Sequence, residues 1–287
     1  MLRIALLYLR PNTHMKKNIF YLSLLILLAQ SSFAQRFGKM LKEAPGVVSF
    51  TFRDAFSEDV PRTLDMIKAM GMTNIEFSNL FKLSAEQMRA LLDARGMRCT
   101  TLGVGYGDMN NPEKVIKTAK ALGAEFVRIP SIPHKDAIDS TIIKKAVADF
   151  NAFGKKLKEN GLEFCFHNHG PEFVPGGDFF KETLFDYLVQ KTDPKYVSFE
   201  MDVLWVLVPG YDPIAYLKKY PKRFKLMHLK DRPKAGGENV ALGSGQIDMK
   251  ELIKVAQKTA VKYFYIEDES KGVKQQVPKS LEYLKSL

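Results

Sequence analysis

Eight short apolar runs recur along the chain, and each is followed by a polar stretch whose apolar residues have helical spacing. The runs span residues 47–52, 74–78, 99–105, 126–130, 164–169, 197–203, 224–230 and 263–267. They are almost continuously apolar, as strands are when a parallel sheet is buried on both faces. Eight strand–helix units without a spare domain-sized segment predict an α/β fold, a single-domain (β/α)8 TIM barrel.

Capping residues mark where the helices begin. Ser84 and Gln87 have the spacing of a capping box. Asp178 and Asp248 are expected to cap helices that run to residues 190 and 259. Further helices are predicted over 59–70, 111–123 and 139–160, from Asp212, and over 278–287.

The first residues of the chain differ from the rest. Lys16 and Lys17 form a basic start, residues 19–29 are apolar, and Ala34 ends a small-residue cleavage motif. The predicted domains are a leader (1–34) with a signal peptide (15–34), and the barrel (35–287). We therefore expect export to the periplasm. The apolar stretch is shorter than the ~20 residues of a membrane span, so no membrane attachment is expected after cleavage.

Composition narrows the range of functions. The net charge is +11, but the lysines are spread over helix faces and form no basic run with interleaved aromatic residues. Nucleic acid is therefore not an expected partner. The two cysteines, Cys99 and Cys165, lie in apolar runs on strands that are not neighbours, so we expect two free thiols.

Polar side chains gather at the ends of the last four strands. Residues two apart on a strand share a face, which pairs His167 with His169, Glu200 with Asp202, His228 with Lys230, and Glu267 with Glu269. The carboxyl ends of barrel strands meet at one rim, where active sites lie. Two imidazoles and two carboxylates at this rim suit one divalent ion, such as Mn²⁺, Co²⁺, Zn²⁺ or Mg²⁺. Such an ion would polarise a carbonyl and acidify the adjacent C–H.

Several motifs resemble those of the sugar phosphate isomerase/epimerase family of xylose-isomerase-like TIM barrels, which also includes inosose dehydratase. They are His-Asn-His at 167–169, Met-Asp-Val-Leu-Trp at 201–205, Pro-Gly-Tyr-Asp-Pro at 209–213, His-Leu-Lys-Asp at 228–231, Gly-Ser-Gly-Gln-Ile-Asp at 243–248 and Ile-Glu-Asp-Glu at 266–269. The resemblance covers essentially the whole chain after the leader. It implies metal ligands at His167, Asp202, His228 and Glu267.

One residue departs from the family pattern. Epimerases of this family typically carry Glu where this chain has His167, which weakens the case for a symmetric exchange of protons between two glutamates. The His-Leu-Lys-Asp motif resembles that of inosose dehydratase and places Lys230 on the metal face. Crowding by a cation and desolvation would lower the pKa of Lys230, so that it could serve as acid or base. This pattern favours β-elimination as an alternative reaction.

Other residues are expected to support the site. Glu76, Trp205 and Glu269 are expected to contact the substrate, although Glu76 could equally be a buried partner and Trp205 a packed aromatic beneath the loop. Glu200 lies one layer below Asp202 and is expected to orient the site as a buried partner. The glycines at 243–245 are either an amide nest for an anion or the turn that the next helix requires.

The expected function is that of a metal-dependent sugar isomerase/epimerase that removes a proton next to a metal-bound carbonyl of a carbohydrate. Glu267 is the expected base, and Lys230 or His169 its acid partner. A lyase or hydratase acting on keto-sugars or 3-keto-glycosides is the alternative, and a non-catalytic sugar-binding barrel is a lesser one. The chain has five histidines, and one of them, His14, lies in the leader. The four that remain are too few for the multi-metal site of a DNA-repair enzyme of the endonuclease IV kind. The expected partner is a small carbohydrate, and assembly into a homo-oligomer is left open.

Overall fold

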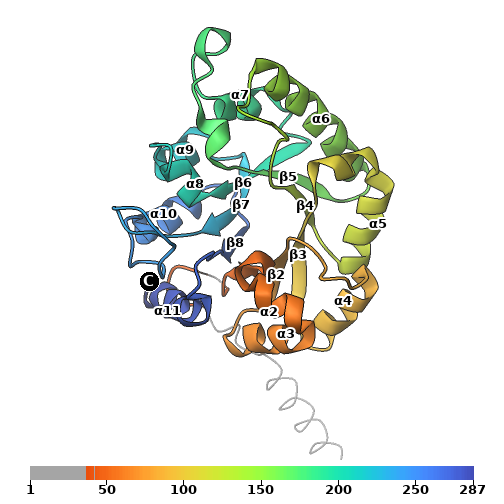
Figure 1. Ribbon diagram of the computed structural model, residues 1–287, viewed down its shortest axis with the longest axis vertical. Coiled ribbons are helices and arrows are strands. Elements are labelled where there is room, and N and C mark those ends of the chain that lie inside the picture. Colours follow the sequence, from red (N-terminus) through yellow and green to blue (C-terminus); the bar gives the residue numbers. More distant parts are fainter. Residues whose placement is uncertain (1–36, 42) are drawn as a thin grey trace, which may run out of the picture. The chain divides into compact units, whose positions relative to one another are not determined.

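Eight parallel strands close into a barrel in sequence order, so that β1 pairs with both β2 and β8 (Figure 1). The strands are β1 (Gly46–Val48), β2 (Asn74–Phe77), β3 (Arg98–Gly103), β4 (Phe126–Ile129), β5 (Glu163–His167), β6 (Val197–Asp202), β7 (Phe224–Leu229) and β8 (Tyr263–Ile266). The predicted (β/α)8 barrel is confirmed. This computed structural model describes residues 37–41 and 43–287, so the predicted signal peptide at 15–34 lies outside the described residues.

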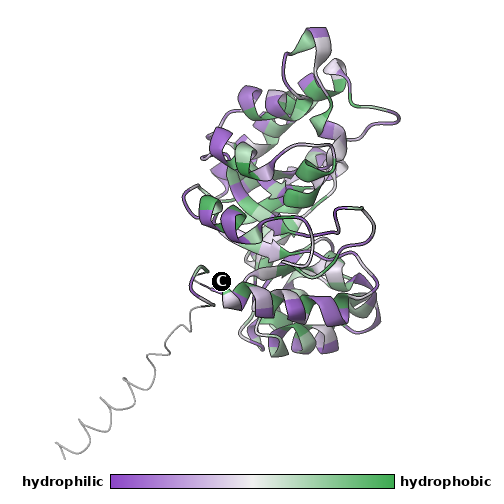
Figure 2. Ribbon diagram, turned by 90° about the vertical axis from the view of Figure 1, so that its left-hand side faces the viewer, coloured by the Kyte–Doolittle hydropathy of each residue, from purple (hydrophilic) through white to green (hydrophobic). Residues whose placement is uncertain are grey.

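Helices surround the barrel wall (Figure 1). They are α2 (Arg53–Glu58), α3 (Val60–Ala69), α4 (Ala85–Asp93), α5 (Pro112–Leu122), α6 (Ser140–Glu159), α7 (Leu184–Lys191), α8 (Val203–Leu207), α9 (Pro213–Lys219), α10 (Met249–Ala256) and α11 (Val273–Ser286). The strands are mostly hydrophobic, whereas the helices combine hydrophobic and hydrophilic residues (Figure 2). Phe150 of α6, for example, packs against Phe164 and Phe166 of β5 with ring centroids 5.0 and 4.9 Å apart. Burial of such apolar faces between helix and strand is the main force that holds the barrel together.

Most of the predicted caps are present. The capping box of Ser84 and Gln87 forms at the start of α4. The side chains of Asp212 and Asp248 accept backbone N–H groups at the first turns of α9 and α10. These local signals therefore set the helix boundaries, because each satisfies N–H groups that the helix itself leaves unpaired.

Three predicted boundaries are wrong. The strand predicted over 47–52 ends at Val48, and the chain continues as a 3-10 helix (Ser49–Phe52), in which the hydroxyl of Ser49 accepts a hydrogen bond from the N–H of Ser78. Thr183, not Asp178, caps α7 through a capping box. The last helix begins at Val273, and Pro278 lies inside it at the cost of one backbone hydrogen bond.

Both cysteines are free and buried, as expected. Among the described residues, no helix is long and apolar enough to cross a membrane.

Candidate functional site

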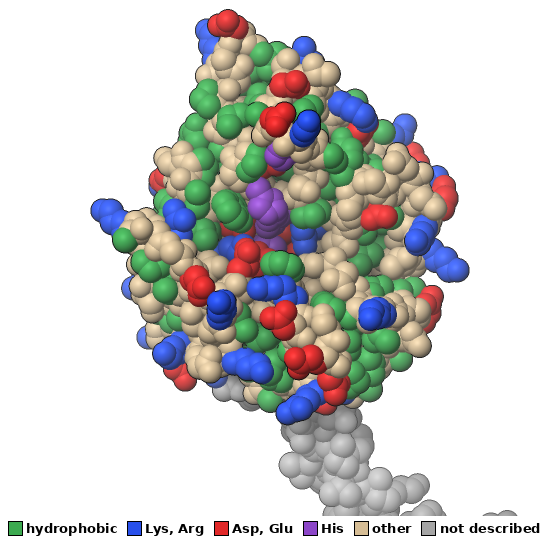
Figure 3. All heavy atoms as spheres, viewed as in Figure 1, with side chains coloured by type: hydrophobic (Ala, Val, Ile, Leu, Met, Phe, Trp, Pro, Cys, Tyr) green, Lys and Arg blue, Asp and Glu red, His purple; other side chains and the backbone are tan. Residues whose placement is uncertain are grey.

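The carboxyl ends of β5 to β8 bring the predicted polar side chains together. His167, Asp202 and His228 are buried there, and Glu267 is 8% exposed. The space-filling view shows histidine side chains in a hollow on one face of the molecule, with acidic and basic side chains beside them (Figure 3). The hollow lies at the end of the barrel where active sites of this fold occur.

Three of the predicted ligands form a compact group. One donor atom each of Asp202, His228 and Glu267 lies within 4.8 Å of the others. Nδ1 of His228 is 2.9 Å from Oε2 of Glu267. His167 lies beside this group, with Nε2 3.8 Å from Oδ2 of Asp202. Imidazole and carboxylate groups at such spacing fit a divalent ion of the Zn²⁺ or Mn²⁺ type, so the predicted donor set is compatible with a metal.

Lys230 reaches into the same group. Its Nζ lies 3.0 Å from Oδ2 of Asp202 and 2.8 Å from Oε2 of Glu267, and it also donates a hydrogen bond to Oε1 of Glu269. Burial alone would lower the pKa of Lys230, but these carboxylates raise it well above its ordinary value. The surrounding negative charge outweighs desolvation and keeps the amine protonated. The lowered pKa expected for Lys230 next to a bound cation stays a prediction.

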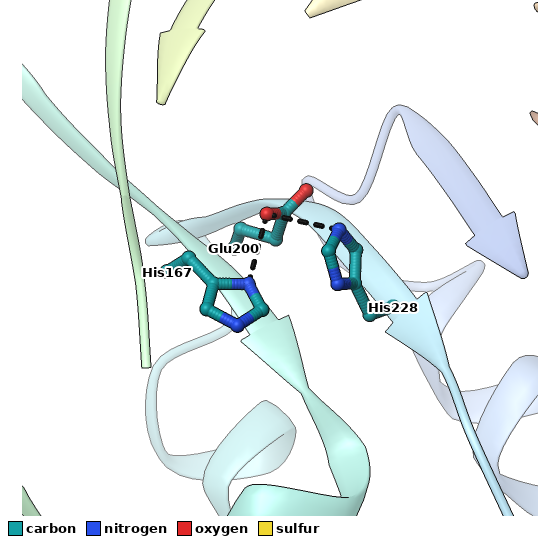
Figure 4. A group of neighbouring side chains, drawn as sticks. All are labelled: His167, Glu200 and His228. Carbon is teal, nitrogen blue, oxygen red and sulfur yellow. Dashed lines mark hydrogen bonds and ion pairs between the residues drawn. The ribbon is translucent and has the colours of Figure 1, made fainter. Parts of the chain in front are cut away.

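Glu200 lies between the two histidines and contacts both (Figure 4). Its Oε2 lies 3.0 Å from Nδ1 of His167 and 3.1 Å from Nε2 of His228. These contacts fix the orientation of both rings and leave Nε2 of His167 and Nδ1 of His228 facing Asp202 and Glu267. Glu200 is fully buried, in the layer beneath Asp202 that its strand position predicted.

Arg128 of β4 was not foreseen from the sequence. Its Nε lies 2.7 Å from Oε1 of Glu76 and 3.4 Å from Oε2 of Glu200, inside the barrel. The available signal was a charged residue between Val127 and Ile129 in an otherwise apolar run. Because a guanidinium cannot be deprotonated in proteins, an ion bound beside Glu200 would meet a permanent positive charge. The outer group of Asp202, His228 and Glu267 has the ammonium of Lys230 beside it instead. Because this ammonium is carried on a flexible stem and can move aside, the outer group is the better candidate for a metal.

Glu76 lies deeper than a substrate-contacting residue was expected to lie. It is fully buried, and its Oε1 is 3.1 Å from Nε2 of His228 as well as close to Arg128. Burial alone would raise the pKa of Glu76, but the charges of Arg128 and His228 lower it. Its Oε2 has no hydrogen-bond partner among the described residues. Substrate binding by Glu76 stays a prediction.

The two histidines at Glu200 differ in charge. Burial and the nearby positive charge of His228 hold the pKa of His167 well below its ordinary value, so His167 is neutral. Burial would also lower the pKa of His228, but Glu200 and Glu76 raise it well above the ordinary value. Burial and the Glu76 carboxylate raise the pKa of Glu200 itself to about 8. Since only a neutral imidazole binds a metal, His228 would release a proton on binding one.

His169 and Trp205 stand together beside the ligand group. Their ring centroids are 5.7 Å apart, and the His169 ring is 4.7 Å from that of His167. Burial lowers the pKa of His169, and its Nδ1 has no hydrogen-bond partner in the part of the chain that the structure describes. Trp205 belongs to α8, whose first turn is capped by the side chain of Asp202. A half-buried aromatic next to a neutral imidazole can contact the face of a sugar ring.

The glycine loop after β7 is occupied by the protein's own carboxylate. Oδ2 of Asp231 accepts hydrogen bonds from the N–H groups of Gly243 and Gly245, at 3.1 and 3.0 Å. Oδ1 accepts hydrogen bonds from the N–H groups of Arg232 and Ile247. The loop is therefore a nest for an anion, but the anion is the side chain of Asp231.

Comparisons with known proteins place the chain in a family. Residues 64–287 match the model of the xylose isomerase-like TIM barrel family. The chain is 23% identical over 201 residues to an inosose dehydratase from Geobacillus kaustophilus, which covers 62% of this chain and 63% of that enzyme. The chain thus spans less than two thirds of this relative.

Solved structures share the fold. A sugar phosphate isomerase/epimerase from Parabacteroides distasonis superposes with a TM-score of 0.73 at 23% identity, covering 85% of this chain and 94% of that one. The IolI protein, solved with a bound zinc atom, superposes with a TM-score of 0.65 at 13% identity, covering 84% of this chain and 95% of that one. The chain belongs to the xylose isomerase-like TIM barrel family, as its motifs predicted. An inosose dehydratase is among its sequence relatives, and a sugar phosphate isomerase/epimerase and an L-ribulose 3-epimerase are among the solved structures with the same fold.

Proposed function

We propose that this protein is a divalent-metal-dependent enzyme of the sugar isomerase/epimerase type, which removes a proton from the carbon next to a carbonyl group of a carbohydrate. The observation that carries the proposal is the group formed by Asp202, His228 and Glu267, whose donor atoms lie within 4.8 Å of one another at the carboxyl end of the barrel. The zinc-containing relative and the isomerase/epimerase relative, both with the same fold, support it.

The residues that would hold the ion are Asp202, His228 and Glu267, with His167 beside them. Glu200 orients the two histidines from below, and Arg128 keeps Glu200 and Glu76 compensated. When bound, a divalent ion supplies Lewis-acid polarisation of a carbonyl, which makes the neighbouring C–H more acidic.

Proton transfer falls to side chains around this group. The carboxylate of Glu267 is held ionised, because Lys230 and His228 lower its pKa well below the ordinary value despite its burial. His169 is neutral and has a ring nitrogen without a partner among the described residues, so it can accept or donate a proton. Lys230 is protonated and can donate one. Glu267 as base, with His169 or Lys230 as acid, accounts for removal and return of a proton.

Elimination is the second candidate reaction. A proton exchange between two glutamates would need a carboxylate at the position of His167. His167 is instead a neutral imidazole whose Nδ1 is held by Glu200, so it does not take that role. The protonated Lys230 could instead donate its proton to a departing oxygen, while the base takes the proton from carbon and the electrons form the C=C bond. The inosose dehydratase among the relatives supports a dehydratase or lyase acting on keto-sugars or 3-keto-glycosides.

One experiment separates these reactions. Purified protein loaded with Mn²⁺ or Zn²⁺ is incubated in D₂O with ketoses and, separately, with 3-keto-glucosides, and followed by NMR. Incorporation of deuterium with a new epimer or aldose supports the isomerase/epimerase reaction. Loss of water or of the aglycone supports elimination. No exchange with either substrate set, together with saturable sugar binding, would instead favour a sugar-binding barrel.

The proposed setting is the periplasm. The basic start, apolar stretch and cleavage motif over residues 15–34 support a signal peptide. Export would expose the enzyme to carbohydrates outside the cytoplasm.

A further inference from the structure

Lys230 holds the same carboxylate oxygens that a metal ion would need. Its Nζ lies 3.0 Å from Oδ2 of Asp202 and 2.8 Å from Oε2 of Glu267, two residues of the outer donor group. Lys230 is 2% exposed, so this ammonium is buried with its partners rather than solvated at the rim. Its third partner, Glu269, has a side chain that is 39% exposed and lies outside the donor group.

We propose that Lys230 is an internal cation that competes with the divalent ion, balancing the carboxylates when no ion is bound and giving them up when one binds. This inference rests on the proposed metal site. A divalent ion coordinates carboxylate oxygens at about 2.0–2.2 Å, so it would use the lone pairs that now accept from the ammonium. Two cations on the same oxygens would also repel each other strongly in a buried site.

Two consequences follow for the proposed reaction. First, the site can fold without metal, because Asp202 and Glu267 are never left as uncompensated buried charges. Second, entry of the ion releases the ammonium from these two carboxylates, while Glu269 can still accept from it. Lys230 then has donor capacity to offer a substrate oxygen, so metal binding and the availability of the acid are linked.

The arrangement contrasts with that of a second lysine. Lys219 is also held by two carboxylates, with Nζ 2.6 Å from Oε1 of Glu182 and 2.8 Å from Oδ1 of Asp186. It lies on α9, its side chain is 40% exposed, and none of its partners belongs to the donor group. Lys219 therefore provides a matched control for the loss of a paired lysine.

The test measures metal affinity, not activity. Full-length mature protein is freed of metal with a chelator, and the Kd for Zn²⁺ and for Mn²⁺ is measured by competition with a chromophoric chelator. Lys230→Met is expected to lower the Kd at least about tenfold, since the ion no longer has to displace a cation. Lys230→Gln, which keeps a hydrogen-bond donor but no charge, should show the same change in Kd. It replaces Lys230→Met in the measurement if that variant does not fold. Lys219→Met should leave the Kd unchanged.

An unchanged or raised Kd in both Lys230 variants would contradict the proposed competition between Lys230 and the ion, provided that Asp202→Asn still weakens metal binding. If Asp202→Asn binds the ion as well as the wild type does, the proposed metal site itself is wrong, which is a separate failure. If Lys219→Met tightens binding as much as Lys230→Met, the effect is one of overall charge and the inference also fails.

Discussion

Nε of Arg128 lies 2.7 Å from Oε1 of Glu76, and both side chains are buried inside the barrel. The pair forms the floor of the site, since Oε1 of Glu76 also reaches His228. Glu200, 3.4 Å from the same guanidinium nitrogen, extends the floor to His167. Part of the positive charge that compensates Glu76 thus comes from β4, a strand that contributes none of the proposed ligands.

Removal of that charge should destabilise the fold. Arg128→Met removes the guanidinium from the side of Glu76, and breaking a buried ion pair on one side typically costs about 3–5 kcal/mol. We expect a loss of this size in the free energy of unfolding, measured by urea denaturation at pH 7. Adding Glu76→Gln to the variant should restore a large part of it. A loss below about 1 kcal/mol for Arg128→Met alone would contradict the assignment of Arg128 as a counter-charge of Glu76.

Asp202→Asn should abolish metal binding and turnover while the barrel stays folded. Asn keeps an oxygen that can cap α8, where the Asp202 side chain now accepts from the N–H groups of Leu204 and Trp205, but it removes the charge. Loss of a ligand should weaken metal affinity by at least about a hundredfold, because even second-shell changes cost 10–100-fold. Metal content and calorimetric titration measure it. The matched control is Asp212→Asn, which alters the cap of α9 outside the site and should bind metal normally.

The stability of the protein should depend on the ionisation of Glu172. Burial raises the pKa of Glu172 to about 7, from an ordinary value of 4.5. The folded state therefore keeps a proton that the unfolded state has lost, so this contribution to stability is present below about pH 4.5 and is lost as the pH rises to about 7. The loss is ~3 kcal/mol for a shift of this size.

Glu172→Gln isolates this effect. Gln cannot ionise and can still accept the N–H of His169, which lies 2.7 Å from Oε2 of Glu172. The free energy of unfolding of the variant minus that of the wild type should therefore rise between pH 5 and pH 8. A difference that is independent of pH would rule out an elevated pKa at this position.

The mature protein should begin at Gln35. When the full chain is expressed in a bacterium with a periplasm, the cleavage motif that ends at Ala34 predicts removal of residues 1–34. Intact-mass measurement of protein from the periplasmic fraction checks the cleavage point. Ala34→Leu should block cleavage, since the processing site requires a small residue there. Recovery of unprocessed chain from the cytoplasm of the wild type would contradict export.

The barrel and its rim were predictable because their signals are periodic and local. Parallel strands buried on both faces read as apolar runs, and residues two apart share a face, so His167, Asp202, His228 and Glu267 could be expected at one rim. The helix caps at Ser84 and Asp248 depend only on neighbours along the chain, and both form.

Features that depend on contacts between distant segments were not predictable. The segment at Ser49 leaves the strand, and its hydroxyl accepts a hydrogen bond from the N–H of Ser78, a residue that follows β2. The pKa of Lys230 depends on how many carboxylates surround it, which spacing along one strand does not reveal. Arg128 was overlooked for the same reason, because its partners lie on β2 and β6.

The carboxylate of Asp231 has a consequence for which groups this loop can bind. It already accepts from the N–H groups of Gly243, Gly245 and Ile247, so a phosphate that approached this loop would face a resident negative charge instead of free amides. The amides of this loop are therefore already used, and a phosphate group could bind there only by displacing the Asp231 side chain.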